Sequence, residues 1–257
     1  MHPRKRSWRT NAIFLIVLWI VLLIASVTIL SSVVTPFLRN LQTVNLVSLD
    51  WGGYSVSSNV LIPQPQVVGV NGSWTVPTVT PSGVDAFSAA WIGIGGQSDT
   101  TLIQVGSEHD SINGKAAYSL WYEMLPADAT AIPNIDVSQS DKITASVNLA
   151  NSNTNEWIIE ISDVTTGQSF KQTFAYNSSR LTAEWIIERP PVNNQIATLA
   201  NFGTVTFTEA KAQIADTVGT ISAFSNSAIL MEDRQNRQLV KVSDFGRDGS
   251  SFTVSYV

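Results

Sequence analysis

The stretch NEWIIEISDVTTGQSFKQTFAY, residues 155–176, contains two β-rich runs that are joined by a turn. Successive side chains of a strand point to opposite faces of its sheet. Glu156 and Glu160 would therefore share one face, and Trp157 would lie on the other. A Thr-Gly pair between the runs favours a chain reversal. The stretch predicts two neighbouring antiparallel strands in a sheet with one solvated face.

The same kind of pattern continues along the chain beyond residue 50. Short β-rich runs recur at spacings of roughly 8–15 residues, and no long window shows the 3.6-residue period of an amphipathic helix. Asn71-Gly72, inside the run 66–77, predicts a further hairpin. The chain has neither the helices of a βαβ fold nor the repeated signature of a propeller. Residues 51–257 are therefore expected to form one all-β domain, an antiparallel sandwich or barrel.

The composition excludes several kinds of chemistry. The 257 residues include no cysteine, so the chain has no disulfide framework, no thiol chemistry and no cysteine-bound zinc. With only His2 and His109, a multi-histidine metal site or a Ser-His-Asp triad has almost no material. His109 precedes an aspartate in a polar stretch, which favours a surface histidine over a triad base. We expect no metal and no cofactor.

The charges are unevenly distributed along the chain. Five of the 15 basic residues lie within the first 39 positions, and all 20 acidic residues lie beyond them. Residues 41–257 carry 10 basic and 20 acidic groups, a net charge of about −10. Phosphate contacts need clustered Lys and Arg, so this part of the chain is a poor nucleic-acid binder.

An uncharged, strongly apolar run occupies residues 12–35. At about 1.5 Å per residue, a helix of this length crosses a hydrocarbon core of about 30 Å. The basic residues within 1–11 predict a cytoplasmic N-terminus, a membrane signal anchor at 12–35, a tether at 36–50 and a domain delivered outside the cell. A cleaved signal peptide is the alternative, and it would release the domain as a secreted protein.

The pentapeptide EWIIE occurs a second time, within LTAEWIIERPP at residues 181–191. Glu184 and Glu188 would share one face of this strand, as Glu156 and Glu160 do in the first copy. Periodicity does not separate the two copies, because either glutamate pair could be solvated. Their surroundings differ: the first copy leads into a hairpin turn, whereas two prolines stop the second.

Several motifs resemble those of one known family. FSAAWIGIGG, LIQVG, WYEMLP, DVTTGQSF, TAEWIIE and FGTVTF occur in the same order as motifs of the glutamic peptidases, the eqolisins, from about Trp51 to Ala210. Members of that family are acid-acting endopeptidases with a lectin-like (concanavalin A-like) sandwich of two seven-stranded antiparallel sheets. The resemblance implies this fold and the hydrolysis of polypeptide substrates without a cofactor, and we expect a monomer.

The resemblance also implies which residues carry the chemistry. The family's catalytic glutamine and glutamate fall on Gln104 and Glu184, and Trp91, Glu123 and Trp121 fall near them as substrate-binding residues. Glu184 would take a proton from water and return it to the leaving amine. The amide of Gln104 would donate to the developing oxyanion. Hydrogen bonds from Gln104 or a backbone N–H would keep the pKa of Glu184 low.

The sequence departs from the family's motif at one position, and two alternative functions are compatible with the same fold. Gly95 stands where the family has an aspartate, so a carboxylate near the site is missing. The sandwich could instead be a non-catalytic extracellular module that binds carbohydrate or protein, whose ligand affinity would survive loss of Gln104. It could also be a glycoside hydrolase that uses Glu123 and Glu184, at a separation of about 5–5.5 or 6.5–9.5 Å. The presence of Gln104 in its matching motif favours the peptidase.

Overall fold

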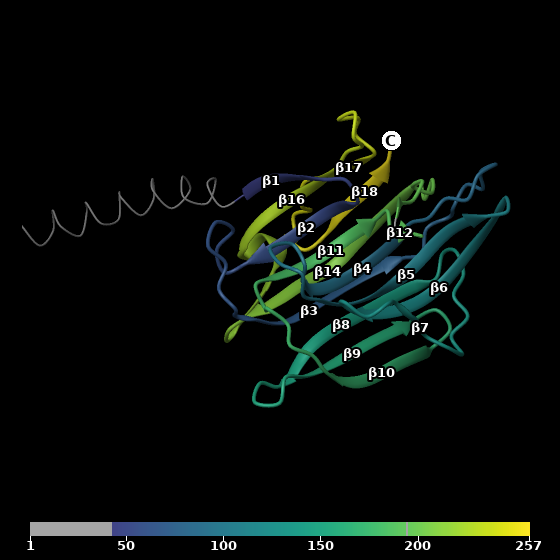
Figure 1. Ribbon diagram of the computed structural model, residues 1–257. Helices are drawn as coiled ribbons and strands as arrows, with labels where there is room; N and C mark the ends of the chain where they lie inside the picture. Colours follow the sequence, from purple (N-terminus) through teal and green to yellow (C-terminus); the bar gives the residue numbers. More distant parts are fainter. Residues whose placement is uncertain (1–42, 194) are drawn as a thin grey trace, which may run out of the picture. The chain divides into compact units, whose positions relative to one another are not determined.

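Two large β-sheets pack face to face in the computed structural model (Figure 1), which describes residues 43–193 and 195–257. The predicted all-β sandwich is confirmed. In the described part of the chain, the one helical turn is the 3₁₀ helix η1 (Ile221–Ala223), and no helix could cross a membrane. The basic terminus predicted at 1–11 and the anchor predicted at 12–35 lie outside the described residues.

The first sheet has eight strands and carries both residues predicted to be catalytic. Its strands, in spatial order, are β1 (Thr43–Ser48), β16 (Ser225–Met231), β2 (Trp51–Ser57), β11 (Thr182–Glu188), β4 (Ala89–Gly95), β5 (Leu102–Ile112), β6 (Lys115–Met124) and β7 (Thr130–Ala131). Neighbouring strands are antiparallel except β1 and β16, which are parallel. The central strands are β2, β11, β4 and β5.

β-structure is present earlier in the chain than the sequence predicted. Residues 43–48, expected in the tether at 36–50, form β1 at the edge of the first sheet. Thr43 pairs with Asn226 and Ser48 with Met231. Because the partner strand lies far away in the sequence, the local pattern gave no signal for this pairing.

The second sheet packs against one face of the first. Its strands are β10 (Gln168–Ala175), β9 (Glu156–Asp163), β8 (Lys142–Asn151), β3 (Val67–Thr75), β14 (Thr204–Ile214), β18 (Phe252–Tyr256) and β17 (Val240–Val242), with β15 (Thr217–Thr220) paired to β14. A small separate hairpin consists of β12 (Pro191–Val192) and β13 (Gln195–Ile196). β9 and β10 pair in antiparallel register, which confirms the two strands predicted from residues 155–176.

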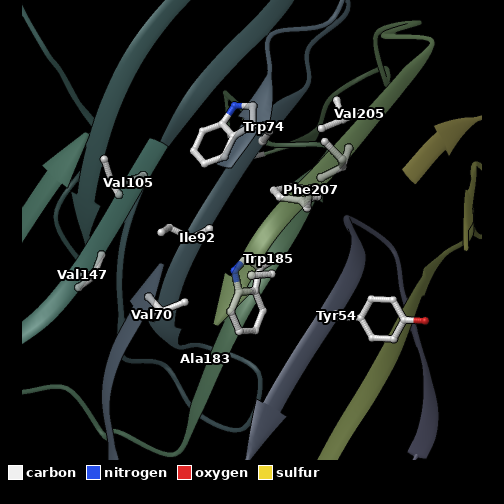
Figure 2. Close-up of a cluster of buried hydrophobic side chains, with 14 of the residues drawn as sticks. Tyr54, Val70, Trp74, Ile92, Val105, Val147, Ala183, Trp185, Val205 and Phe207 are labelled. Carbon is white, nitrogen blue, oxygen red and sulfur yellow. The ribbon is translucent and has the colours of Figure 1, made fainter. Parts of the chain in front are cut away.

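Alternate side chains of both sheets fill the layer between them. Figure 2 shows Ile92 and Trp185 of the first sheet beside Val147 and Phe207 of the second, and all four are completely buried. The indole N–H of Trp185 donates to the carbonyl oxygen of Asn71 on the opposite sheet at 2.9 Å. The core therefore buries large aromatic area while it satisfies the polar atom of Trp185.

The hairpin predicted at Asn71-Gly72 is wrong, because β3 runs straight through both residues. A Cβ atom at Gly72 would lie 2.9 Å from the indole ring of Trp185, so the glycine makes room for this ring. The side-chain amide of Asn71 donates to the carbonyl oxygen of Glu209, at a register shift in β14. Packing between sheets, and not a turn, accounts for this Asn-Gly pair.

The opposite face of the first sheet carries a second apolar cluster. Its buried members are Ala89, Trp91, Leu102, Trp121, Ile186 and Ile229. Strands β4 and β11 are consequently buried on both faces, whereas strands of a sandwich usually have one solvated face. The candidate site lies on this second face.

Candidate active site

The two residues predicted to be catalytic lie on one transverse row of the first sheet. Glu184 on β11 faces Gly93 on β4, Gly93 faces Gln104 on β5, and Gln104 faces Glu123 on β6. Neighbouring strands are about 4.8 Å apart, so the backbones at Glu184 and Gln104 are roughly 10 Å apart. The strand between them has no side chain at this point. We call these four residues the polar row.

Glu184 is completely buried, and neither oxygen of its carboxyl group has a hydrogen-bond partner among the described residues. Burial raises the pKa of Glu184 well above its usual value. Asp99 adds to this rise in pKa. The hydroxyl of Thr182 and the N–H of Gly95 oppose it, although neither meets the geometry of a hydrogen bond to the carboxyl group. The low pKa expected from the sequence is therefore wrong, because burial outweighs the nearby donors.

Gln104 is also buried, and Glu123 fixes its amide group. Its Nε2 donates to Oε2 of Glu123 at 2.5 Å, while its Oε1 is buried without a partner among the described residues. Burial raises the pKa of Glu123, and the hydrogen bond from Gln104 opposes that rise. An amide NH₂ has two hydrogens, so one hydrogen of Gln104 and its carbonyl oxygen are left for a substrate.

A second row, two residues away from the polar row on each strand, is apolar. Ile186, Trp91, Gly106 and Trp121 face one another in succession on β11, β4, β5 and β6. Trp91 is completely buried, and its ring meets that of Trp51 edge to face, with centroids 4.9 Å apart. A Cβ at Gly106 would lie 2.5 Å from the carbonyl oxygen of Ala90 and 2.6 Å from the Cβ of Trp91, so the glycine permits the close approach of β4. We call these four residues the apolar row.

An acidic cleft of about 1140 Å³ lies on this face of the sheet. Gln104, Trp121 and Glu123 line it, whereas Trp91 and Glu184 are covered. Six carboxyl groups line the cleft, and none of its described lining residues is Lys or Arg. The six are Asp50, Glu108, Asp110, Glu123, Asp128 and Glu188.

Two of these carboxyl groups, Glu188 and Asp110, are protonated in acid. Burial, together with Asp50, raises the pKa of Glu188 to about 8, although Glu188 accepts a hydrogen bond from the Trp91 indole at 2.7 Å. Burial and Glu108 raise the pKa of Asp110 to about 7. Asp110 and Glu188 are therefore neutral in acid, and each adds a negative charge to the cleft as the pH rises through about 7 and 8 respectively.

We did not single out Glu108, Asp110 and Glu188 from the sequence as site residues. Alternation could have indicated them, because Glu188 shares a strand face with Glu184, and Glu108 and Asp110 share one with Gln104. The sequence does not show that this face lines a cleft.

The surface position expected for His109 is wrong. His109 is completely buried on the core side of β5, and its Nε2 lies 2.7 Å from the hydroxyl oxygen of Ser107. The indole N–H of Trp74 donates to the same hydroxyl at 2.8 Å. Burial lowers the pKa of His109 to about 3. This pair faces the core and not the cleft, so it has no access to a substrate.

Gly95 lies beside the polar row, in a conformation that favours glycine. Its φ is 93°, and a Cβ at this position would collide with the carbonyl oxygen of Thr101. An aspartate does not fit this backbone. The carboxylate of Asp99, four residues further on, acts on Glu184 instead. Among the described residues, no group of three or more His, Asp or Glu side chains is placed to hold a metal ion.

Comparison with known proteins identifies the class to which this sandwich and its acidic cleft belong. The model of the Peptidase A4 family matches residues 50–256. The chain belongs to this family, which confirms the resemblance to the glutamic peptidases.

Individual relatives agree with this assignment. Aspergillopepsin-2 from Aspergillus niger is 31% identical over 175 residues, which cover 66% of this chain and 59% of that protein's length. The crystal structure of aspergilloglutamic peptidase from Aspergillus niger has a TM-score of 0.59 and 30% identity, over 67% of this chain and 99% of that one. Scytalido-glutamic peptidase with a transition state analog inhibitor has a similar fold, with a TM-score of 0.69 and 24% identity, over 82% of this chain and 99% of that one.

Proposed function

We propose that this protein is an acid-acting endopeptidase in which Glu184 and Gln104 hydrolyse peptide bonds. The observation that carries the proposal is the polar row, in which a buried carboxyl group and a fixed amide flank Gly93. Membership of the Peptidase A4 family supports peptide bonds as the target. The raised pKa values in the cleft support action in acid.

In the proposed mechanism, Glu184 is first a general base and then a general acid. A water molecule between the row and the scissile carbonyl attacks the carbonyl carbon and gives a proton to Glu184. Glu184 then passes this proton to the amide nitrogen as the C–N bond breaks and the amine leaves. A water that donates to the ionised carboxylate favours the ionised form. This contact offsets part of the effect of burial on the pKa of Glu184. Because the rest of the burial effect keeps the pKa of Glu184 above its usual value, the base is not ionised in strong acid. We therefore expect an activity optimum in weak acid.

Gln104 would stabilise the oxyanion with the amide hydrogen that Glu123 does not use. Glu123 holds the amide in place, so no reorientation is needed when charge develops. Loss of one such donor typically lowers the rate by about 10²–10³.

The cleft would bind an extended polypeptide. Trp121, which lines it beside Gln104 and Glu123, offers an apolar contact next to the polar row. Ionisation of Asp110 and Glu188 near neutral pH would put repelling charges into the cleft and oppose binding of acidic or apolar segments. We also propose that the enzyme works outside the cell, on the basis of the basic residues that precede the run 12–35.

Cleavage of a denatured protein tests this function. The full chain, its Glu184→Gln variant and a Glu160→Gln control would be compared at pH values from 2 to 7. We expect cleavage in acid by the wild type and the control, and none by Glu184→Gln. Equal cleavage by all three proteins would remove Glu184 from the mechanism. No cleavage by a well-folded wild type would favour the non-catalytic binding module.

A further inference from the structure

A second hollow, separate from the acidic cleft, is lined by basic side chains. It has a volume of about 630 Å³, and its lining includes Arg189, Arg234, Arg237 and Asp233. Only five arginines occur in residues 43–257, where acidic residues outnumber basic ones by two to one. Three of these five therefore gather around one hollow, which we call the arginine hollow.

The one carboxylate in the arginine hollow is already engaged by its own turn. Asp233 accepts hydrogen bonds from the backbone N–H groups of Gln235 at 2.8 Å and Arg237 at 3.0 Å, and from Nε of Arg237 at 2.6 Å. Within the described residues, neither Arg189 nor Arg234 forms an ion pair. The hollow therefore has more positive charge than its carboxylate balances.

Arg189 is held in place by backbone contacts. Its N–H donates to the carbonyl oxygen of Asp50 at 2.8 Å, and its Nη2 donates to that of Leu49 at 2.7 Å. Its Nε is buried and has no acceptor among the described residues. The carboxylate of Asp50 acts on Arg189 from the side of the acidic cleft. A buried donor without an acceptor is costly, so the protein leaves the guanidinium group of Arg189 incompletely hydrogen-bonded.

The hollow and the cleft are neighbours, because the hairpin of β12 and β13 borders both. Residues 190–193 line the cleft, and Gln195 and Ile196 line the hollow. Arg189 follows Glu184 by five residues, which is roughly 17 Å along an extended chain. A polypeptide that lies in the cleft parallel to β11 would thus reach the hollow about five residues from the scissile bond.

The ligand must keep its negative charge where the enzyme works. Guanidinium groups stay charged at all relevant pH values, whereas Asp and Glu side chains lose their charge in acid. A phosphate monoester has a second pKa of about 6, so in acid it loses its second charge but keeps the negative charge of its first ionisation, and it offers three acceptor oxygens. Arginine pairs well with such oxygens.

We propose that the arginine hollow binds the phosphoryl group of a phosphorylated side chain in the polypeptide substrate, about five residues from the scissile bond. The substrate part of this statement rests on the proposed function. The binding site itself rests on the three arginines and on Asp233, which its own turn already engages.

Direct binding tests the site without catalysis. The full chain carrying Glu184→Gln would be titrated by calorimetry at pH 4 with peptides that have phosphoserine five residues to either side of the expected scissile bond, and with their serine counterparts. We expect one phosphopeptide to bind about tenfold more tightly than its counterpart, as for one charged hydrogen bond. Inorganic phosphate should compete with it. Adding Arg234→Gln should remove the preference, and adding Arg247→Gln, at an exposed arginine outside the hollow, should preserve it.

The outcomes separate the site from the function. Equal affinity for both peptides, no binding of either, or a preference that survives Arg234→Gln and Arg189→Gln would overturn the proposal. Binding of a sulfated oligosaccharide in place of the phosphopeptide would also overturn it. In the wild type, we expect a lower KM and an unchanged kcat for the phosphopeptide. If the wild type cleaves neither peptide while the arginine-dependent preference is present, the site stands and the proposed function falls.

Discussion

The two copies of EWIIE have the same residues and opposite surroundings. In β9 of the second sheet, buried and partly exposed residues alternate, and Trp157 packs in the core while Glu160 pairs with Lys171 at 2.8 Å in a solvated position. In β11 of the first sheet, Trp185 packs in the same core, but Glu184 on the other face is completely buried too.

The difference arises from what lies across the strands. Glu160 faces Ser146 and Lys171, so it has a cation beside it and water above it. Glu184 faces Ser55 and Gly93, and no cation lies opposite it on either strand. The same glutamate is thus an ordinary surface charge in one sheet and a group with a raised pKa in the other. The neighbouring strands, and not the pentapeptide itself, therefore decide whether the pKa of this glutamate is raised.

Gly93→Ser should reduce the difference between the surroundings of Glu184 and Glu160, and it should have the largest effect on activity. It gives Glu184 the kind of neighbour that Glu160 has, but a Cβ at this position lies 2.9 Å from the Cβ of Gln104. We expect Gln104 to be displaced and kcat/KM to fall by about 10²–10³, as for a lost oxyanion donor. Steady-state cleavage of a peptide in weak acid measures this.

Ser146→Gly is the matched control, because it gives Glu160 a glycine neighbour in the second sheet. We expect unchanged kcat/KM, and a loss in free energy of unfolding of about 0.5–1 kcal/mol from the added glycine. Full activity of a folded Gly93→Ser variant would show that the open space between Glu184 and Gln104 is not needed for catalysis.

Much of the second sheet could be predicted from local patterns. β9 alternates cleanly because one of its faces meets the core and the other meets water, whereas β10, at the edge of the sheet, is mostly exposed and buries only Phe170 and Phe174 in part. The ordered motifs also placed Gln104 and Glu184, and the structure brings these two into one row.

The first sheet was harder to predict, because its properties depend on distant partners. β1 pairs with a strand about 180 residues later, and the indole of Trp185 occupies space that Gly72 leaves free on the second sheet. His109 lies in a polar stretch and is nonetheless completely buried. The pKa of Glu184 was predicted in the wrong direction, since burial on the second face of a strand is not encoded in alternation.

His109→Gln tests the first sheet's burial of titratable groups. The pKa of His109 is about 3 in the folded protein and 6.5 as its ordinary value. As the pH falls, His109 is therefore protonated at a higher pH in the unfolded chain than in the folded protein. The wild type consequently loses stability as the pH falls from 6.5 towards 3. We expect this loss to be about 2–4 kcal/mol smaller in His109→Gln. Urea unfolding at pH 7 and pH 3 measures it, and each protein's own value at pH 7 cancels the packing cost of the substitution.

Glu188→Gln should have the smallest effect on stability. The stability that Glu188 contributes is lost as the pH rises, whereas that of His109 is lost as the pH falls. The pKa of Glu188 is about 8 in the folded protein and 4.5 as its ordinary value. The wild type is therefore fully stabilised below pH 4.5, and it loses this stability as the pH rises towards 8. Glutamine stays neutral throughout this window. Since Glu188 is partly exposed, we expect the variant to be about 1–2 kcal/mol more stable than the wild type at pH 8, relative to pH 4.

Thermal unfolding measures this difference, at about 2–4 °C per kcal/mol for a domain of this size. Glu160→Gln, the equivalent change at the last glutamate of the first copy, should show no such gain at pH 8, because it removes a solvated ion pair of small worth. A gain that is equal in both variants would mean that general relief of negative charge, and not burial of Glu188 beside Trp91 and Asp50, sets the pH dependence of stability.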